Sequence, residues 1–373
     1  MSTPPLRPAL AAIPAYKAGK PPAGGPTAYK LSSNENPYPP LPSVLDKVVL
    51  ASGSVNRYPD MGMSALLEAL AEKLGVDIAR LACATGSVAV LYHLLQAACG
   101  EGDEVVYAWR SFEAYPIAVG LTGATDVRVP LTADARHDLA AMRDAVTEAT
   151  RVVIVCTPNN PTGPAVGHGE LLEFIDAIPS SVVVVIDEAY REFATGPDTV
   201  DGLELAGGRD NVVVLRTFSK AYGLAGLRVG YGIAPPRLAE AIRKCALPFG
   251  VSHVAQVAAV ASLEPAAEIE LFERVDALVA ERARVVDALR GQGWTLPDAQ
   301  GNFVWFPLGD RAADFAARCD ERGASVRPFA GEGVRVTIGE SQANDVVLSV
   351  AADMLVPEPE RQRNRLEDVT GTG

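Results

Sequence analysis

One stretch decides the fold of this chain: Thr217-Phe218-Ser219-Lys220-Ala221-Tyr222-Gly223-Leu224-Ala225-Gly226-Leu227-Arg228. It follows the apolar run 212–215, so we expect the lysine where a buried strand opens into a cleft. Loss of hydration there lowers the pKa of a lysine, and its neutral amine can form a Schiff base with an aldehyde. Arg228 can return past two glycines to the same cleft, where Ser219 offers a hydroxyl group to an anion. For Lys220 taken alone, an ordinary surface lysine is the alternative.

Two further motifs place polar side chains beside apolar runs. In Asn159-Asn160-Pro161-Thr162-Gly163 the second asparagine can direct its amide into the cleft, although a plain Asn-Pro turn is the common interpretation. Asp187 ends the run 182–186, and a carboxylate buried there is costly unless it meets a cation. Tyr190 can direct its hydroxyl group toward the same cleft. The three motifs therefore predict one shared site.

These motifs resemble the fold-type I aminotransferases that use pyridoxal 5′-phosphate. The resemblance rests on Ser-Lys-Ala-Tyr-Gly-Leu-Ala-Gly-Leu-Arg at 219–228, Asn-Asn-Pro-Thr-Gly at 159–163 and Asp-Glu-Ala-Tyr at 187–190. It runs from about Pro14 to Leu355 and is greatest to the histidinol-phosphate and aromatic aminotransferases. It implies an α/β fold, in which a large domain has a mostly parallel sheet between helices and a smaller α/β domain follows.

The resemblance also assigns roles to residues around the cofactor ring. Lys220 is implied to hold the cofactor and then to move the proton of the reaction. Asp187 is implied to keep the pyridine nitrogen protonated, and Asn160 and Tyr190 to bond the ring oxygen. Phe112 takes the place of the aromatic residue that stacks on the ring, with a plain core phenylalanine as the alternative. Lys220, Asp187 and Tyr190 are our predicted catalytic residues.

A phosphate site is predicted where Thr-Gly-Ser-Val-Ala at 85–89 opens a helix at 90–98. Glycine allows close approach of the backbone, and the free N–H groups of a first helical turn favour an anion. The family often carries a carboxylate two or three positions after this glycine, and this chain does not. The predicted phosphate cup consists of Gly86, Ser87, Val88, Ser219 and Arg228.

Tyr58 precedes a proline in a turn, and a purely structural role in packing that turn is the alternative. The matching tyrosine of the family crosses the dimer interface and bonds the cofactor phosphate of the partner subunit. The resemblance therefore implies a homodimer with shared active sites, in which Tyr58 is a cofactor-binding residue.

For the substrate, the main candidate is Arg335, which alternates with apolar neighbours and can point inward to bind a carboxylate; a structural ion pair is the alternative. Glu332 would repel a phosphate dianion, whereas Phe329 and Phe303 could enclose an aromatic ring, so we expect an aromatic amino acid rather than histidinol phosphate. The resemblance also implies Tyr16 and Asn36 as substrate contacts, although Tyr16 could equally pack the arm against the rest of the chain. The predicted substrate-binding residues are Arg335, Tyr16, Asn36, Arg327 and Phe303.

The implied reaction moves the amino group of phenylalanine, tyrosine or tryptophan to 2-oxoglutarate and back. A histidinol-phosphate aminotransferase is the alternative, and a pyridoxal-phosphate decarboxylase of the same fold is a more remote one. A non-catalytic regulator would need an added DNA-binding helix-turn-helix, for which the chain has neither the length nor the basic charge. The expected partners are a small amino acid and a 2-oxo acid.

Composition is consistent with this interpretation. A net charge of −13 and a pI near 4.9 disfavour nucleic acid as a partner. The five cysteines are far apart and indicate buried thiols rather than disulfides, and the four histidines lack metal-ligand spacing. Without a signal peptide or a membrane-spanning apolar run, we expect a cytoplasmic protein.

Valine- and isoleucine-rich runs alternate with helical periodicity, which by itself favours a parallel sheet with ligands at the carboxyl ends of its strands. Strands are predicted at 104–107, 126–129, 152–156, 182–186, 212–215, 301–306 and 333–338, and helices at 64–74, 90–98, 138–149, 169–177, 235–247, 265–291 and 312–322. The predicted domains are an arm at 1–30, a large cofactor-binding domain at 31–264, a small domain at 265–356 and a disordered tail at 357–373.

Overall fold

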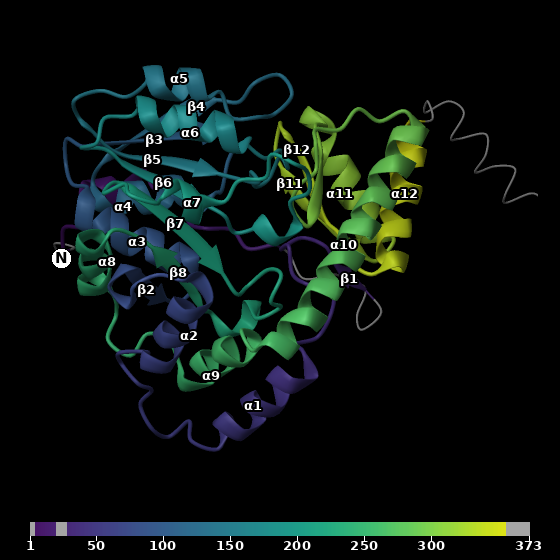
Figure 1. The fold of residues 1–373 in the computed structure, drawn as a ribbon. Helices are drawn as coiled ribbons and strands as arrows, with labels where there is room; N and C mark the ends of the chain where they lie inside the picture. Colours follow the sequence, from purple (N-terminus) through teal and green to yellow (C-terminus); the bar gives the residue numbers. More distant parts are fainter. Residues whose placement is uncertain (1–3, 20–27, 356–373) are drawn as a thin grey trace, which may run out of the picture.

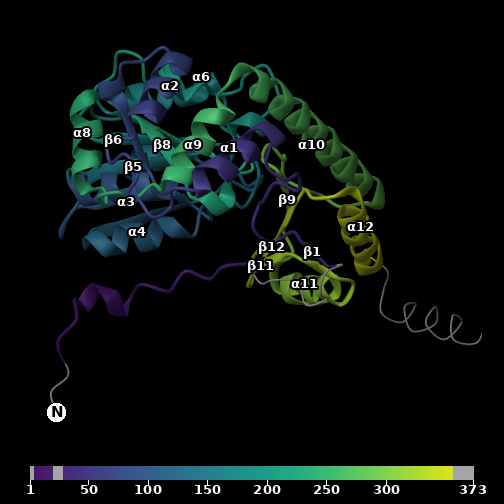
Figure 2. The same cartoon turned by 90° about the horizontal axis from the view of Figure 1, so that it is seen from below.

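The computed structural model describes residues 4–19 and 28–355 (Figure 1). The predicted tail at 357–373 lies outside the described residues, as do parts of the predicted arm, 1–3 and 20–27. The described part of the arm is a largely irregular segment (Figure 2), and its short 3₁₀ helix, Pro8–Ala11, packs against the helix Ala114–Thr122.

A seven-stranded sheet forms the centre of the molecule, in the order β2-β8-β7-β6-β5-β3-β4. Its strands are β2 (Leu81–Ala84), β3 (Glu104–Trp109), β4 (Thr125–Pro130), β5 (Thr150–Cys156), β6 (Val183–Asp187), β7 (Val212–Thr217) and β8 (Gly230–Ile233). β8 runs antiparallel to both of its neighbours, and the other pairs are parallel. The predicted mostly parallel sheet is confirmed.

Helices cover both faces of this sheet, because successive residues of each buried strand point to opposite sides. In β6, Val185 packs with one apolar cluster, and Val184 and Ile186 with the other. The first cluster includes α3 (Ser87–Ala98), α4 (Ala114–Thr122) and α8 (Pro236–Cys245). The second includes α2 (Ser64–Leu74), α5 (Leu139–Asp144), α6 (His168–Ala177), α7 (Gly202–Leu205) and α9 (His253–Ser262), and α1 (Pro42–Ser52) packs on α9.

The long helix α10 (Pro265–Gln292) leads from the large sheet to a smaller unit (Figure 1). There an antiparallel sheet in the order β11-β12-β9 consists of β11 (Arg327–Phe329), β12 (Gly333–Thr337) and β9 (Phe303–Phe306). It packs with α11 (Ala312–Glu321), and α12 (Ser341–Leu355) packs on α10 and α11. β1 (Tyr29–Lys30), which follows the arm, pairs with β10 (Ala324–Ser325) of this unit. We propose that α10 begins the small domain.

Short 3₁₀ helices complete the described elements: η1 (Pro8–Ala11), η3 (Ile78–Arg80), η4 (Arg191–Phe193), η5 (Ala225–Leu227) and η6 (Gly309–Arg311). One predicted element is wrong in length, because the helix expected at 138–149 ends at Asp144. The hydroxyl group of Thr150 accepts from the Thr147 backbone N–H, and the Thr147 hydroxyl group donates to Glu104. These local bonds favour a turn over continued helix.

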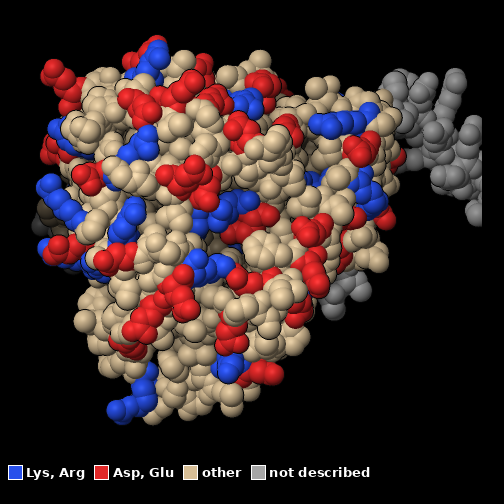
Figure 3. All heavy atoms as spheres, viewed as in Figure 1, with Lys and Arg blue, Asp and Glu red and all other residues tan. Residues whose placement is uncertain are grey.

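Acidic and basic side chains are interspersed over the face shown in Figure 3. Within residues 4–19 and 28–355, no helix is both long enough and apolar enough to cross a membrane.

Candidate active site

The predicted motifs converge at one edge of the large sheet. The carboxyl ends of β2, β3, β5, β6 and β7 lie there, and Arg228 precedes the antiparallel β8 at the same edge. The cavity at this edge has a volume of about 320 Å³. It is lined by Tyr16, Gly86, Ser87, Val88, Phe112, Asn160, Asp187, Tyr190, Ser219, Lys220, Arg228, Arg327 and Arg335, together with neighbours that include Ser33, Glu113 and Cys156.

The amine of Lys220 points into this pocket from the loop after β7. Its Nζ donates to the backbone oxygens of Ser33, at 3.2 Å, and Asn34, at 3.3 Å. Burial, and to a smaller extent the nearby cations Arg335 and Arg228, lower the pKa of Lys220 to about 7, while Glu35 acts in the opposite direction. The amine is therefore neutral for a large fraction of the time near neutral pH, as nucleophilic and base chemistry require.

Asp187 ends β6 with a buried carboxylate in the same pocket. Burial raises its pKa, while the bonds from the Tyr115 hydroxyl group, at 2.7 Å, and the Ala189 N–H, at 3.3 Å, lower it. Among the described residues no lysine, arginine or histidine forms an ion pair with it. A protonated pyridine nitrogen would supply the missing cation, so this carboxylate fits the ring of pyridoxal phosphate.

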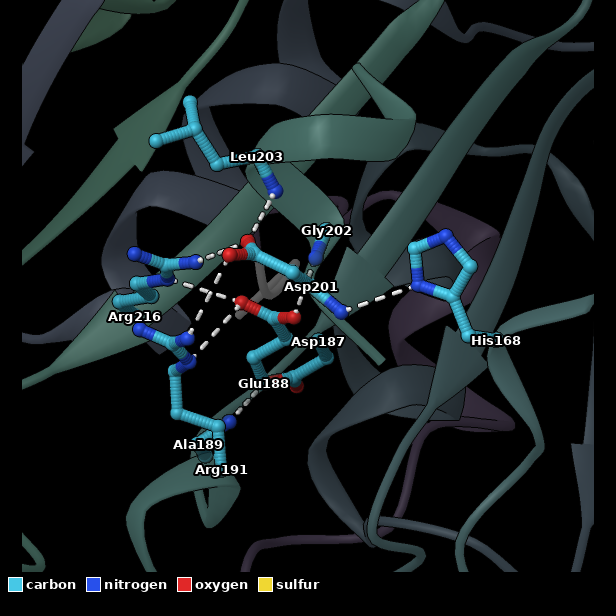
Figure 4. Close-up of polar contacts among 9 residues, drawn as sticks. All are labelled: His168, Asp187, Glu188, Ala189, Arg191, Asp201, Gly202, Leu203 and Arg216. Atoms are coloured by element: carbon cyan, nitrogen blue, oxygen red, sulfur yellow. Dashed lines mark hydrogen bonds and ion pairs between the residues drawn. The ribbon is translucent and has the colours of Figure 1, made fainter. Parts of the chain in front are cut away.

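Behind Asp187, its neighbour Glu188 forms a buried ion pair with Arg216 of β7 (Figure 4). Arg216 Nε donates to Glu188 Oε2 at 2.8 Å, and the Gly202 N–H donates to Oε1 at 2.7 Å. Asp201 accepts from Arg216 Nη2 at 3.2 Å. Neither Glu188 nor Arg216 lines the pocket, so this pair joins the two strand ends that carry the predicted catalytic residues.

The predicted phosphate cup is assembled where α3 begins at Ser87. Arg228 Nη1 donates to Ser219 Oγ at 3.2 Å, which brings a guanidinium and a hydroxyl group to the N-terminus of this helix. Gly86 has a φ of +95°, and a Cβ there would lie 2.8 Å from Arg228 Nη2. Only glycine fits this cradle, which suits a phosphate bound by backbone N–H groups.

Tyr190, Asn160 and Arg335 are held by hydrogen bonds that join the loops after β6 and β5 and the strand β12 to one another and to the segment after β1. The Asn34 amide donates to the Tyr190 hydroxyl group at 2.9 Å, and Arg335 Nη1 donates to Asn160 Oδ1 at 2.5 Å. Arg335 Nη2 donates to the backbone oxygen of Ser32 at 2.8 Å. Arg335 is buried, and within the described residues its Nε has no hydrogen-bond partner, so it retains a donor for an anion.

Three predicted residues do not line the pocket. Tyr58 is 83% exposed and stacks on Phe249, with ring centroids 4.7 Å apart. The Asn36 amide donates to the backbone oxygens of Lys220, at 3.4 Å, and Ala221, at 2.9 Å, so it supports the lysine loop from outside. Phe303 is fully buried and packs edge-on against Tyr190, at 5.0 Å. It lies beneath the pocket wall.

The reasoning that favoured an aromatic substrate is wrong in its particulars. Glu332 forms an ion pair with Arg110 and does not line the pocket. Phe329 also lies outside it, packed against Trp305 with ring centroids 5.4 Å apart. Phe329 shares a face of β11 with Arg327, but its ring is covered by the guanidinium groups of Arg110 and Arg327. Glu332 lies in the turn that precedes β12.

Sequence reasoning missed Tyr115, Asn34 and Glu113. Tyr115 and Asn34 bond Asp187 and Tyr190, and Glu113 pairs with Arg327. A signal existed for Asn34, because an asparagine in the turn 31–37 can take up the left-handed backbone region. In the structure its φ is 52°, which lies in that region. For Tyr115 and Glu113 the pattern of the sequence offers no comparable signal.

The fold and this site define a pyridoxal-phosphate type of transferase. The chain belongs to the aminotransferase class I and II family, whose model matches residues 26–350. The resemblance found in the motifs is confirmed, as is the fold class.

Proteins named aromatic amino acid aminotransferase are similar to this chain over nearly its whole length. The one from Streptomyces avermitilis is 61% identical over 350 residues, which cover 94% of this chain and 97% of the relative. The one from Thermobifida fusca is 54% identical over 348 residues, covering 93% and 96%.

Among solved structures, histidinol-phosphate aminotransferase from Sinorhizobium meliloti, in complex with pyridoxal 5′-phosphate, has a TM-score of 0.85. It is 27% identical and covers 94% of this chain and 98% of its own. A Thermus thermophilus aspartate aminotransferase has a TM-score of 0.81 at 22% identity, covering 95% and 100%, and shows the fold alone.

Proposed function

We propose that this protein is a pyridoxal-phosphate-dependent aminotransferase that moves the amino group of an aromatic amino acid to 2-oxoglutarate and back. The observation that carries the proposal is one pocket in which the Lys220 amine, with its pKa lowered to about 7, faces the buried carboxylate of Asp187. A base that titrates near the working pH and an anion without a cation are the two groups that this chemistry needs.

Pyridoxal 5′-phosphate is the cofactor, as the family and the S. meliloti structure indicate. When bound, it supplies a carbonyl carbon that takes up the amino group and a ring that accepts electrons from the substrate α-carbon. The residues that would hold the phosphate are Gly86, Ser87, Val88, Ser219 and Arg228, and those that would hold the ring are Phe112, Asn160, Asp187 and Tyr190.

Lys220 performs the proton transfer in this proposal. Its neutral amine accepts the proton from the substrate α-carbon, and the same Nζ then delivers it to C4′, the cofactor carbon that takes up the amino group. Asp187 keeps a proton on the ring nitrogen, because two unit charges at about 4 Å attract by about 4 kcal/mol at an effective dielectric constant of 20. The Tyr115 hydroxyl group donates to Asp187 Oδ2 and the Ala189 N–H donates to Oδ1, so both oxygens of the carboxylate are held in place.

Arg335 binds the substrate carboxylate. Its guanidinium is buried at the pocket wall, and its Nε is left without a partner among the described residues. A carboxylate matches the paired donors of a guanidinium, which fixes the amino acid with its α-carbon toward the lysine. The side chain of the substrate then meets Tyr16, Leu91 and Phe112, which also line the pocket.

The choice of aromatic substrates rests on the names of the relatives, which are 49–61% identical to this chain. Neither histidinol-phosphate transamination nor decarboxylation is favoured by them. The test is kcat/KM for phenylalanine or tyrosine against that for histidinol phosphate, with 2-oxoglutarate as acceptor, because this ratio compares transition-state binding. A tenfold preference for histidinol phosphate, about 1.4 kcal/mol, would overturn the aromatic assignment and leave the aminotransferase assignment intact.

We also propose a homodimer in which Tyr58 bonds the cofactor phosphate of the other subunit. Tyr58, Met61 and Leu247 are exposed apolar side chains, at 83%, 60% and 74% exposure. Met61, Leu247 and Phe249, the ring partner of Tyr58, line one surface pocket with Thr85, which precedes the phosphate cup. Mixing inactive Lys220→Ala with an inactive Tyr58→Ala variant should restore activity, because one site of a mixed dimer has both groups. Heterodimers without activity would refute the shared site. A cytoplasmic location stays a prediction.

A further inference from the structure

Two arginines of the small sheet face the same pocket, and they differ in whether an acidic side chain pairs with them. Arg327 and Arg335 are directly opposite each other in the β11–β12 register, so both guanidinium groups lie on one face of the hairpin. Both line the pocket. Arg335 is deeper and forms no ion pair within the described residues, whereas Arg327 pairs with Glu113, which immediately precedes α4.

The hydrogen bonds of Arg327 engage both of its terminal guanidinium nitrogens. Nη2 donates to Glu113 Oε2 at 2.8 Å, to Glu113 Oε1 at 3.1 Å and to the Lys17 backbone oxygen at 2.6 Å. Nη1 donates to the Ala18 backbone oxygen at 3.0 Å. Arg327 therefore fastens the arm over the pocket mouth and is neutralised by a carboxylate that itself lines the pocket.

The charges of these three groups reach one another. Burial lowers the pKa of Arg335, Arg327 lowers it further, and Glu113 raises it. An anion bound to Arg335 therefore also experiences Arg327 and Glu113, whose opposite charges largely cancel at that point. A single carboxylate needs only Arg335, but a larger phosphate dianion needs a second guanidinium and would approach the Glu113 carboxylate to reach it.

We propose that Glu113 is a specificity-determining residue, which holds Arg327 and thereby limits the anionic end of the amino donor to one carboxylate. The excluded class consists of amino donors that carry a phosphate ester in place of the carboxylate, such as histidinol phosphate. This inference rests on the proposed function of the same pocket. The repulsion of a phosphate dianion, first expected from Glu332, is assigned to Glu113 instead, because Glu332 pairs with Arg110 outside the pocket.

The test is Glu113→Gln, with Glu332→Gln as the matched control because it neutralises the other acid that pairs with an arginine across this mouth. The donor half-reaction is followed on the holoenzyme without acceptor, using phenylalanine and histidinol phosphate. In Glu113→Gln the ratio of kcat/KM for histidinol phosphate to that for phenylalanine should rise at least tenfold, and in Glu332→Gln it should stay within threefold.

Inhibition supplies a second measurement that does not depend on turnover of the phosphate ester. Inorganic phosphate should compete with phenylalanine more strongly in Glu113→Gln than in the parent, whereas acetate, a single carboxylate, should show the smaller change. An unchanged ratio and unchanged phosphate inhibition in Glu113→Gln, with a parent enzyme that uses phenylalanine, would overturn the role of Glu113 alone. An equal rise in Glu332→Gln would also overturn it. A parent enzyme that uses neither donor would overturn both this inference and the proposed function.

Discussion

The floor and the mouth of the pocket use charge in opposite ways. At the floor, Asp187 lies beside a buried pair, Arg216 and Glu188, whose side chains are 4% and 1% exposed. At the mouth, Arg327 and Glu113 are 12% and 29% exposed, and they join the β11–β12 hairpin to the loop after β3. The floor is built from neighbouring strand ends, and the mouth from the arm, the loop after β3 and the β11–β12 hairpin.

This difference separates chemistry from selection. Charges at the floor are removed from water, so each interaction between them is strong, and its loss greatly lowers stability or rate. Charges at the mouth are screened and contribute little to stability, yet they decide which anion can approach Arg335. Variants at the floor should therefore change rate or folding, and variants at the mouth should change substrate preference.

The largest effect is expected at the lysine of the floor. Lys220→Ala removes both the covalent anchor and the base, and activity should fall at least about a thousandfold. Lys244→Ala, at an exposed helical position, is the control and should retain activity. Borohydride treatment of the parent holoenzyme should fix the cofactor to the peptide that contains Lys220. Recovery of the label on another lysine would contradict the assignment.

Asp187→Asn should have the next largest effect, about a thousandfold on the single-turnover rate at saturating donor, because about 4 kcal/mol of attraction for a protonated ring nitrogen is lost. The variant should still bind the cofactor, since the phosphate cup is untouched, and absorbance spectra check this. A rate within threefold of the parent would show that the ring is activated by another group.

Glu188→Gln tests the support behind the floor. It leaves Arg216 buried without its main partner, and the free energy of unfolding should fall by about 3 kcal/mol, the lower end for a broken buried pair because Asp201 remains. Denaturant unfolding of the holoenzyme is the measurement. A loss below about 1 kcal/mol would mean that this pair stabilises the fold no more than an exposed ion pair does. Floor and mouth would then not differ in what their ion pairs contribute to stability.

Tyr115→Phe removes a hydrogen bond to the Asp187 carboxylate and should lower kcat by about tenfold. The sign of its pH effect follows from the bond, which lowers the pKa of Asp187 against the raising effect of burial. Without it that pKa rises further, so the carboxylate is lost at higher pH, and the acidic limb of the rate profile should move to higher pH. A profile that only scales down, without this shift, would mean that Tyr115 acts through packing.

The smallest effect is expected at the mouth. Glu332→Gln removes a partly exposed pair with Arg110 and should change the free energy of unfolding by less than about 1 kcal/mol. Measured together with Glu188→Gln, this variant compares two arginine–glutamate ion pairs that differ in burial. Equal losses would refute the view that burial decides their contributions.

Sequence alone predicted the floor because its residues follow directly after apolar runs. Asp187 and Lys220 come at or just after the ends of β6 and β7, and periodicity locates such ends without knowledge of the partners. The long helix expected at 265–291 is Pro265–Gln292 in the structure for the same reason. The fold class, the family and the cofactor followed from these short segments and their order.

The tertiary structure alone decided the polar partners and the mouth. Tyr115 bonds Asp187 across 72 residues, Asn34 bonds Tyr190 across 156, and Glu113 bonds Arg327 across 214. Hydrophobic periodicity records which face of an element is buried, but not which distant polar group that face meets. Glu332 and Glu113 are both acids beside apolar residues, and only the packing of the hairpin against the loop before α4 determines which of them lines the pocket.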